Sequence, residues 1–182
     1  GGPGTGKPTS LRGILGLFEA LGLKTMLCAP TGRAAQRLGD LCGQSASTIH
    51  RLLEAGYDPQ SGRLAFQRDE DEPLKCQAVI VDETSMVDVP LMAALLAALP
   101  SDCRLVLVGD PDQLPSVGPG QVFDHLIRSG VVPNIRLTSI FRQARQSRIV
   151  MNAHSVNRGE VPSLKNQGGD FFFLRRRNAA ED

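Results

Sequence analysis

The chain has 182 residues, 41% of them hydrophobic, which is enough for one sizeable core and the beginning of a second domain. Its formal net charge of +1 provides no global field that attracts nucleic acid, so a polyanion would have to bind in a local groove. The four cysteines form no C-x-x-C pair, which favours reduced thiols in a cytoplasmic protein, and no apolar run approaches the ~20 residues that span a membrane.

The chain opens on Gly1-Gly2-Pro3-Gly4-Thr5-Gly6-Lys7, which fits the phosphate-loop pattern G-x-x-x-x-G-K. Consecutive backbone N–H groups curl round a polyphosphate in such a loop, and glycines leave that approach open and permit positive φ values. The ammonium group of Lys7 adds a mobile positive charge for the β- and γ-phosphate oxygens. The residues expected to bind the nucleotide are Gly2, Pro3, Gly4, Thr5, Gly6, Lys7 and Thr9.

Pro8 departs from the pattern, which has a serine or threonine whose hydroxyl binds Mg²⁺ at this position. Proline suits the first turn of a helix, but it offers neither a hydroxyl nor an N–H group. Thr9 lies about 100° further round the helix and does not simply replace the missing hydroxyl. We therefore expect Pro8 to weaken the binding of Mg²⁺-nucleotide.

A phosphate loop normally joins a buried strand to a helix, and no strand precedes Gly1. Losing a central strand with about five apolar side chains would cost on the order of 8–15 kcal/mol. That loss is comparable to the whole stability of a typical domain, roughly 5–15 kcal/mol. We therefore expect the chain to be a fragment of a longer protein whose first strand is missing.

Helices and short apolar strands alternate after the loop. In the first part of the chain we expect a helix at 10–21, a strand at 25–29, a helix at 33–41 and a unit at 47–53 capped by Ser47 or Thr48. An exposed loop or hairpin follows at 56–73, and then a strand at 78–81, a helix at 87–99, a strand at 104–108 and a helix at 121–128. The last elements are a strand starting at 135–137 and a strand at 171–173 with a charged end at 175–177. This alternation predicts a parallel sheet with right-handed crossovers, whose ligands bind at the carboxyl ends of the strands.

Three polar side chains follow expected strands and carry candidate chemistry. Asp82 and Glu83 come directly after 78–81, where one carboxylate can hold Mg²⁺ and its neighbour can polarise the water that attacks a γ-phosphate. Gln113 follows 104–108, and its amide can both donate to a phosphate oxygen and accept from water. The alternatives are an acidic pair that merely ends a strand and a proline- and glycine-rich turn with incidental polar residues.

Six ordered motifs resemble those of the RecD-like helicases of superfamily 1, which move 5′ to 3′ on DNA. They are GGPGTGK, CAPTGRAAQRL, STIHRLL, VIVDETSM, VGDPDQLPSVGPG and LTSIFRQA, and the resemblance extends from the first residue to about residue 162. It implies a RecA-like P-loop NTPase fold. Residues 1–136 would form a first motor domain that lacks its first strand, and 137–182 would begin a second one.

The resemblance also implies roles for individual residues. Lys7 would bind the β- and γ-phosphates, Asp82 would serve Mg²⁺, and Glu83 would be the catalytic base. Gln113 would sense the γ-phosphate, and Arg142 would act as an arginine finger that neutralises charge on the transferred phosphoryl group. Residues expected to contact single-stranded DNA are Pro30, Thr31, Arg33, Thr48, His50 and Arg51.

The function implied by the resemblance is an ATP-dependent DNA helicase with ATP and Mg²⁺ as cofactors. Its partners would be single-stranded DNA, duplexes with a 5′ overhang and other subunits of a recombination nuclease, and the fragment alone would be inactive. Two alternatives stay open. One is the helicase part of a conjugative relaxase, and the other is a degenerate nucleotide-binding module, for which Pro8 is the argument.

Overall fold

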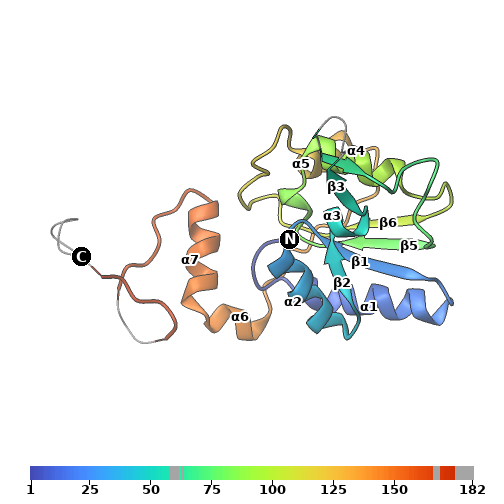
Figure 1. Ribbon diagram of the computed structural model, residues 1–182. Coiled ribbons are helices and arrows are strands. Elements are labelled where there is room, and N and C mark those ends of the chain that lie inside the picture. Colours follow the sequence, from blue (N-terminus) through green and yellow to red (C-terminus); the bar gives the residue numbers. More distant parts are fainter. Residues whose placement is uncertain (58–61, 63, 166–168, 175–182) are drawn as a thin grey trace. The chain divides into compact units, whose positions relative to one another are not determined.

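The computed structural model describes residues 1–57, 62, 64–165 and 169–174. Contacts divide the chain into two compact units, one formed by Lys7–Arg136 and the other by Gly1–Gly6 with Leu137–Asp182. The larger unit is an α/β structure that includes Lys7, and the smaller one holds Gly1–Gly6 of the phosphate loop and two short helices (Figure 1). In the described ranges, no helix combines the length and apolar character that crossing a membrane requires.

A parallel sheet forms the centre of the larger unit, with strand order β2-β1-β5-β6 (Figure 1). Its strands are β1 (Thr25–Ala29), β2 (Ala46–Thr48), β5 (Ala78–Val81) and β6 (Arg104–Leu107). In the register of the sheet, Leu27 pairs with Ile80, and Ile80 pairs with Val106. The predicted α/β fold, a parallel sheet flanked by helices, is confirmed.

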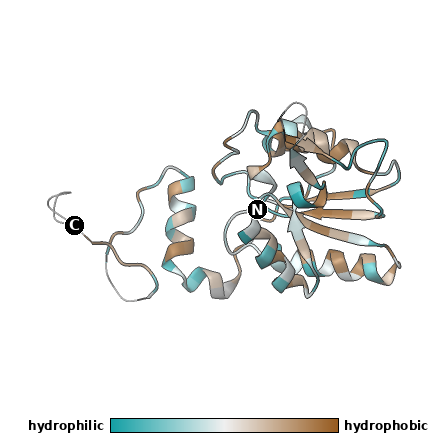
Figure 2. Ribbon diagram, in the orientation of Figure 1, coloured by the Kyte–Doolittle hydropathy of each residue, from teal (hydrophilic) through white to brown (hydrophobic). Residues whose placement is uncertain are grey.

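Helices cover both faces of this sheet. They are α1 (Lys7–Ala20), α2 (Gly32–Cys42), α3 (Ile49–Leu52), the 3₁₀ turn η1 (Thr84–Met86), α4 (Val89–Ala97) and α5 (Val122–Ser129). Because successive side chains of a strand point to opposite faces, Ile80 packs with Leu15 and Leu38 on one face, whereas Val81 packs with Leu95 on the other. Both faces are therefore buried, and hydrophobic residues concentrate on the strands (Figure 2).

Side-chain caps fix where three helices of the larger unit begin. The hydroxyl of Thr31 accepts a hydrogen bond from Ala34 N at the start of α2, and Thr48 accepts one from Arg51 N at the start of α3. Thr48, rather than Ser47, is thus the cap of the third unit. The helix predicted at 87–99 is preceded by η1 and starts only at Val89, because the side chain of the residue before it, Asp88, caps Leu91 N.

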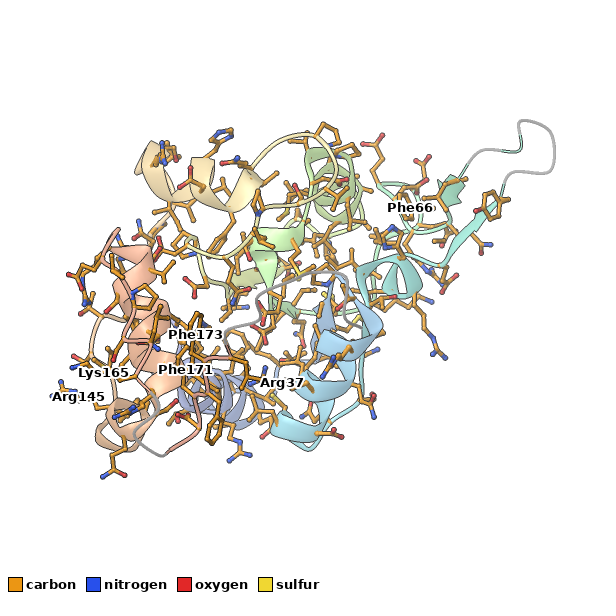
Figure 3. All side chains as sticks on the ribbon, turned by 90° about the vertical axis from the view of Figure 1, so that its left-hand side faces the viewer. Arg37, Phe66, Arg145, Lys165, Phe171 and Phe173 are labelled. Carbon is orange, nitrogen blue, oxygen red and sulfur yellow. The ribbon has the colours of Figure 1, made fainter. Side chains whose placement is uncertain are left out.

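The segment 56–73, predicted to be an exposed loop or a hairpin, forms a hairpin with residue 55. Strands β3 (Ala55–Tyr57) and β4 (Leu64–Phe66) pair antiparallel, with Ala55 opposite Phe66. The ring of Phe66 lies with its centroid 5.9 Å from that of His50 on α3, so it joins the hairpin to the body of the larger unit (Figure 3).

Two strand predictions are wrong. Residues 135–137 form no strand, and Ile135 is 91% exposed. Residues 171–173 likewise have no strand structure, and Phe172 is 67% exposed. An apolar run becomes a strand only where a neighbouring strand supplies backbone partners, and neither segment pairs with one in the described ranges. The charged residues at 175–177 lie outside the described ranges.

The smaller unit contains α6 (Arg142–Gln146) and α7 (Arg148–Asn157). Ser147 caps α7 by accepting a hydrogen bond from Val150 N, and the carboxylate of Asp170 accepts another from Arg148 N at 2.8 Å. These two acceptors satisfy N–H groups that the first turn of the helix leaves without a partner.

Candidate nucleotide site

An acidic cluster with one lysine lies at the carboxyl ends of β5 and β6. Lys7 is the first residue of α1, and its Nζ lies 3.8 Å from Oδ2 of Asp110, which follows β6. The Asp110 side chain is 2% exposed and that of Lys7 is 16% exposed. The pair therefore joins the residue expected to bind phosphate to a buried carboxylate, whose desolvation an opposite charge must offset.

Glu83 is held in an unusual backbone conformation beside this pair. Its φ is 52°, in the left-handed region that residues other than glycine rarely adopt, and its Oε2 is buried without a hydrogen-bond partner among the described residues. Burial raises the pKa of Glu83, and the negative charge of Asp82 raises it further, whereas Lys7 and Arg37 oppose the shift. A strained, unsatisfied carboxylate with a raised pKa is well suited to accept a proton.

Thr84 fastens the turn that carries Glu83. Its hydroxyl donates to the carbonyl oxygens of Val81 and Val108 at 3.1 and 2.9 Å, and its N–H donates to Val108 O at 2.9 Å. Because Val81 ends β5 and Val108 follows β6, these bonds join the ends of two adjacent strands. They hold Asp82 and Glu83 at the edge where a parallel sheet binds its ligands.

Gln113 lies on the loop that leaves the same edge. Its N–H donates to Asp110 O at 3.2 Å, and the N–H of Asp112 donates to Asp110 Oδ1 at 3.3 Å. Further along the loop, the hydroxyl of Ser116 donates to the carbonyl oxygens of Gly118 and Gly120. The side chain of Gln113 is exposed. One buried residue, Asp110, therefore contacts Lys7 and also organises the turn that carries Gln113.

The phosphate-loop residues have the backbone that the pattern predicts. Gly4 and Gly6 have φ values of 73° and 89°, and the hydroxyl of Thr5 donates to Gly2 O at 2.7 Å. Within the same unit, Phe141 N donates to Gly4 O at 3.1 Å, and a Cβ on Gly6 would collide with the Phe141 ring. Both glycines are therefore required by their positive φ values, and Gly6 also by the close approach of the Phe141 ring.

Of the remaining candidates in this group, Pro8 and Thr9 lie exposed in the first turn of α1. Proline is thus accommodated there, as expected for a first helical turn. The carbonyl oxygen of Pro3 lies within hydrogen-bond distance of His154 Nε2, at 2.9 Å. Arg142 begins α6, but its side chain lies outside the described part of the chain.

The two segments expected to contact DNA lie side by side. Ala29 at the end of β1 pairs with Thr48 at the end of β2, so Pro30-Thr31 and Thr48-Ile49-His50 follow adjacent strand ends. The hydroxyls of Thr31 and Thr48 already accept hydrogen bonds as helix caps. Arg33 and Arg51 are exposed and form no ion pair with any described residue.

Three residues near this edge had no role in the sequence-based interpretation. Asp110 was recognisable only as a residue that follows a strand, and its pairing with Lys7 has no local signal. Arg37 lies on α2 (Figure 3), and nothing in the sequence indicates that its charge acts on Glu83. Ser85 is 9% exposed, and its hydroxyl has no hydrogen-bond partner within the described residues.

A parallel sheet whose carboxyl edge gathers a lysine, an acidic pair and the loop that carries Gln113 (the glutamine loop, residues 109–120) defines a RecA-like nucleotide-binding α/β domain. The chain belongs to the AAA domain family, whose model matches residues 1–119. It is 47% identical over 163 residues to the ATP-dependent RecD2 DNA helicase of Deinococcus radiodurans, covering 90% of this chain and 22% of that protein. It is 41% identical over 150 residues to the RecBCD enzyme subunit RecD of Mycolicibacterium smegmatis, covering 70% of this chain and 26% of that protein.

Among solved structures, Bacteroides Pif1 bound to ssDNA matches with a TM-score of 0.56 and 25% sequence identity, over 88% of this chain and 42% of that one. These comparisons confirm the resemblance to RecD-like helicases and the RecA-like fold. The chain spans about a quarter or less of the length of the two curated relatives.

Proposed function

We propose that this chain is the nucleotide-binding part of an ATP-dependent DNA helicase that moves 5′ to 3′ on single-stranded DNA. The observation that carries the proposal is the group formed by Lys7, Glu83 and Asp110 at the carboxyl edge of the sheet, with Gln113 on the adjoining loop. A buried ion pair and a desolvated carboxylate both lower the stability of the folded protein unless they have partners. A bound nucleoside triphosphate would contact Lys7, and its attacking water would contact Glu83.

In this mechanism, the triphosphate displaces Asp110 from Lys7, because the β- and γ-phosphate oxygens offer the ammonium group more negative charge than one carboxylate does. Glu83 accepts a proton from the water that attacks the γ-phosphorus, and the bond to the bridging oxygen breaks to give ADP and phosphate. The pKa of Glu83, raised by burial, favours this proton transfer. Gln113 contacts the γ-phosphate and therefore distinguishes ATP from ADP.

The residues present fit Mg²⁺ bound together with nucleotide. No group of three or more metal-binding side chains occurs in the described ranges, and Mg²⁺ commonly uses one or two carboxylates plus phosphate oxygens and water. The half-buried carboxylate of Asp82 at the end of β5 would hold the ion, whereas Pro8 contributes no ligand. When bound, Mg²⁺ would neutralise charge on the phosphate oxygens.

We further propose that residues 137–182 begin a second motor domain and that Arg142 neutralises charge on the transferred phosphoryl group. The support is local. Phe141, which precedes Arg142, donates its N–H to Gly4 of the phosphate loop within the smaller unit. A guanidinium group carries five donors in a planar fork, which suits phosphate oxygens.

Single-stranded DNA is the proposed track, contacted by Pro30, Thr31, Arg33, Thr48, His50 and Arg51. The support is that these residues follow the ends of two adjacent strands and that both arginines are exposed. Relatives act in a RecBCD enzyme, and we propose subunits of such a nuclease as further partners.

The experiment that tests this function uses the full-length protein. We expect its ATP hydrolysis to rise at least tenfold with single-stranded DNA, and the protein to separate a duplex with a 5′ overhang but not one with a 3′ overhang. Lys7→Ala should abolish both activities. Stimulated hydrolysis without strand separation would reject the helicase, and strand separation of the 3′-overhang duplex alone would reject the direction.

One observation favours a second candidate, a nucleotide-binding module that does not hydrolyse ATP. Pro8 removes a hydroxyl and an N–H group from the position that follows Lys7. Nucleotide binding without DNA-stimulated hydrolysis in the full-length protein would establish this candidate instead.

A further inference from the structure

His154 on α7 makes a polar contact with the backbone of the phosphate loop. Its Nε2 lies 2.9 Å from the carbonyl oxygen of Pro3, and both residues belong to the smaller unit. Because a carbonyl oxygen can only accept a hydrogen bond, Nε2 carries the hydrogen and the imidazole is the donor. A side chain that lies 151 residues further along the chain therefore holds one peptide group of the phosphate loop.

The loop and α7 fit together closely at this contact. A Cβ on Gly2 would lie 2.8 Å from Cε1 of His154, which is closer than a side chain can approach. One turn earlier on the same face of α7, Cγ1 of Val150 would lie 3.3 Å from a Cβ on Gly4, and Cβ of Ala144 would be closer still. Glycines at both positions therefore let the imidazole and its neighbours reach the backbone of the loop.

The hydrogen bond from His154 decides which way the next N–H group of the loop points. The described residues contain no cis peptide bond, and a trans peptide directs its C=O and N–H groups to opposite sides. Since Pro3 O faces α7, the N–H of Gly4 points away from that helix, and it donates to no described residue. Phe141 holds the following peptide group by donating its N–H to Gly4 O at 3.1 Å. Together the two bonds fix Gly4 at its φ of 73°, a left-handed conformation that turns N–H groups toward an anion.

We propose that His154 is a positioning residue of the phosphate loop, whose hydrogen bond to Pro3 O presents the N–H of Gly4 to a phosphate group of the nucleotide. This inference rests on the proposed nucleotide binding and adds a determinant that lies outside the G-x-x-x-x-G-K pattern. His154 itself does not touch the nucleotide. The N–H of Gly4 contacts phosphate both before and during hydrolysis. Loss of the imidazole should therefore raise Kd and KM and leave kcat unchanged.

The test uses the full-length protein and measures Kd for ADP and for a non-hydrolysable ATP analogue, together with kcat and KM of DNA-stimulated hydrolysis. We expect His154→Ala to raise both Kd values about fivefold and to keep kcat within about twofold of the wild type. His154→Gln should restore Kd, because its amide nitrogen can take the place of Nε2 as donor. His154→Asn, whose amide is one methylene shorter, should bind nucleotide as weakly as His154→Ala.

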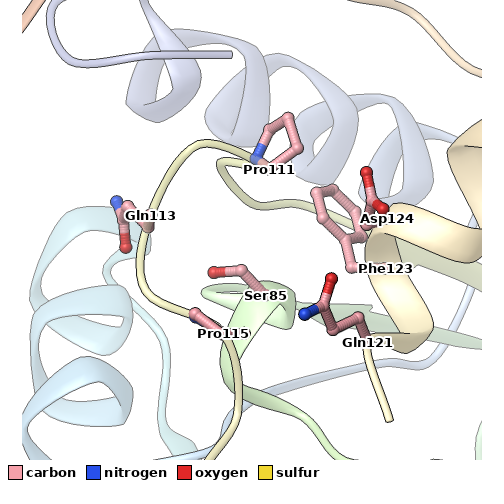
Figure 4. Close-up of a pocket in the computed structure, with 7 residues that line it drawn as sticks. All are labelled: Ser85, Pro111, Gln113, Pro115, Gln121, Phe123 and Asp124. Atoms are coloured by element: carbon pink, nitrogen blue, oxygen red, sulfur yellow. The ribbon is translucent and has the colours of Figure 1, made fainter. Parts of the chain in front are cut away.

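Two control variants remove amide side chains that do not contact the phosphate loop. Asn152 lies on the same helix as His154, and its amide donates to Ser163 O at 3.1 Å and accepts from Ser163 N at 3.0 Å. Gln121 in the larger unit is exposed beside the cavity at the glutamine loop (Figure 4), and its side chain caps no N–H group of α5. Asn152→Ala and Gln121→Ala should both keep Kd within about twofold of the wild type.

A double-mutant cycle with Gly2→Ala tests the contact itself. The added Cβ would displace the imidazole, so Gly2→Ala should raise Kd in the wild type and raise it less in His154→Ala. Additive effects in this cycle would overturn the proposal. So would an unchanged Kd in His154→Ala, no recovery in His154→Gln, or an equal rise in Asn152→Ala.

The same measurements separate this inference from the proposed function. A wild-type protein that binds neither ADP nor the analogue would reject the proposed function, and this role of His154 with it. If the wild type binds both nucleotides and hydrolyses ATP, while His154→Ala binds them as tightly, only the role of His154 is overturned.

Discussion

The ammonium nitrogen of Lys7 lies 3.8 Å from Oδ2 of Asp110, at the carboxyl edge of the parallel sheet. Asp110 also accepts hydrogen bonds from the N–H groups of Asp112 and Gln113. Any ligand that draws Lys7 away from Asp110 therefore acts on the residue that shapes the glutamine loop. This relationship makes Asp110 the first residue to test.

Asp110→Asn should destabilise the nucleotide-free protein by about 1–3 kcal/mol, because it replaces the buried carboxylate that lies 3.8 Å from the Lys7 ammonium with a neutral amide. Nucleotide should then raise the melting temperature of the variant more than that of the wild type, since phosphate supplies the missing negative charge. Thermal denaturation with and without ADP measures both effects. Asp112→Asn is the control, because it also removes a carboxylate from an ion pair, but both Asp112 and its partner Arg136, 3.7 Å away, are exposed. Equal nucleotide-induced shifts in wild type and Asp110→Asn would contradict this explanation.

Glu83→Gln should stabilise the protein while removing its hydrolysis. Burial raises the pKa of Glu83, so the folded state binds this proton more tightly than the unfolded state does. The free energy of unfolding therefore increases as the pH falls from above the raised, folded-state pKa of Glu83 to below its unfolded-state pKa. It decreases again as the pH rises through the same window. At neutral pH the amide should stabilise by about 1 kcal/mol, or roughly 2–4 °C in melting temperature. Hydrolysis should fall about 10²–10⁴-fold.

Melting curves between pH 4 and 8 check the sign of this effect. The stability difference between Glu83→Gln and wild type should shrink toward low pH, where the wild-type carboxyl is also neutral. Glu70→Gln is the control, because Glu70 is exposed within the acidic run at 69–72, and it should change the melting temperature by less than about 1 °C. A Glu83→Gln protein less stable than wild type at pH 7 would be evidence against desolvation of this carboxylate.

Pro8→Ser should raise the affinity for ATP about tenfold in the presence of Mg²⁺, because it restores a hydroxyl ligand and an N–H donor. Pro8→Ala restores the N–H group alone and separates the two contributions. The first turn of α1 is exposed at this position, so neither variant should disturb the fold. Isothermal titration with and without Mg²⁺ is the measurement. If Pro8→Ser and wild type bind alike in Mg²⁺, Pro8 does not limit the site.

Arg33→Gln and Arg51→Gln should each weaken binding of single-stranded DNA about threefold and reduce the salt dependence of binding by about 0.7 per lost phosphate contact. Fluorescence anisotropy of a labelled oligothymidylate at several salt concentrations measures both quantities. Arg128→Gln is a suitable control, because Arg128 is an exposed arginine on α5 that pairs with Asp124. A salt slope unchanged in both variants would exclude these arginines from the DNA contacts.

The strands β1 and β5 could be predicted to the residue, because a strand covered on both faces is a continuous apolar run with polar residues at its ends. The phosphate-loop glycines and the acidic pair were equally evident, since each chemistry restricts the residue types at a fixed spacing. The segment 135–137 has an arginine between two apolar residues, was also predicted as a strand, and forms none. Whether such a segment becomes a strand depends on hydrogen bonding to a neighbouring strand, which cannot be predicted from the local sequence.

The sequence by itself determined the alternation of helices and strands and which side chains follow each strand end, because those depend on local periodicity. Only the tertiary structure decided the strand order β2-β1-β5-β6, the pairing of Lys7 with Asp110, the left-handed backbone of Glu83 and the burial of Ser85. Each of these arises from contacts between residues far apart along the chain, or from the burial that such contacts create. No local pattern encodes them.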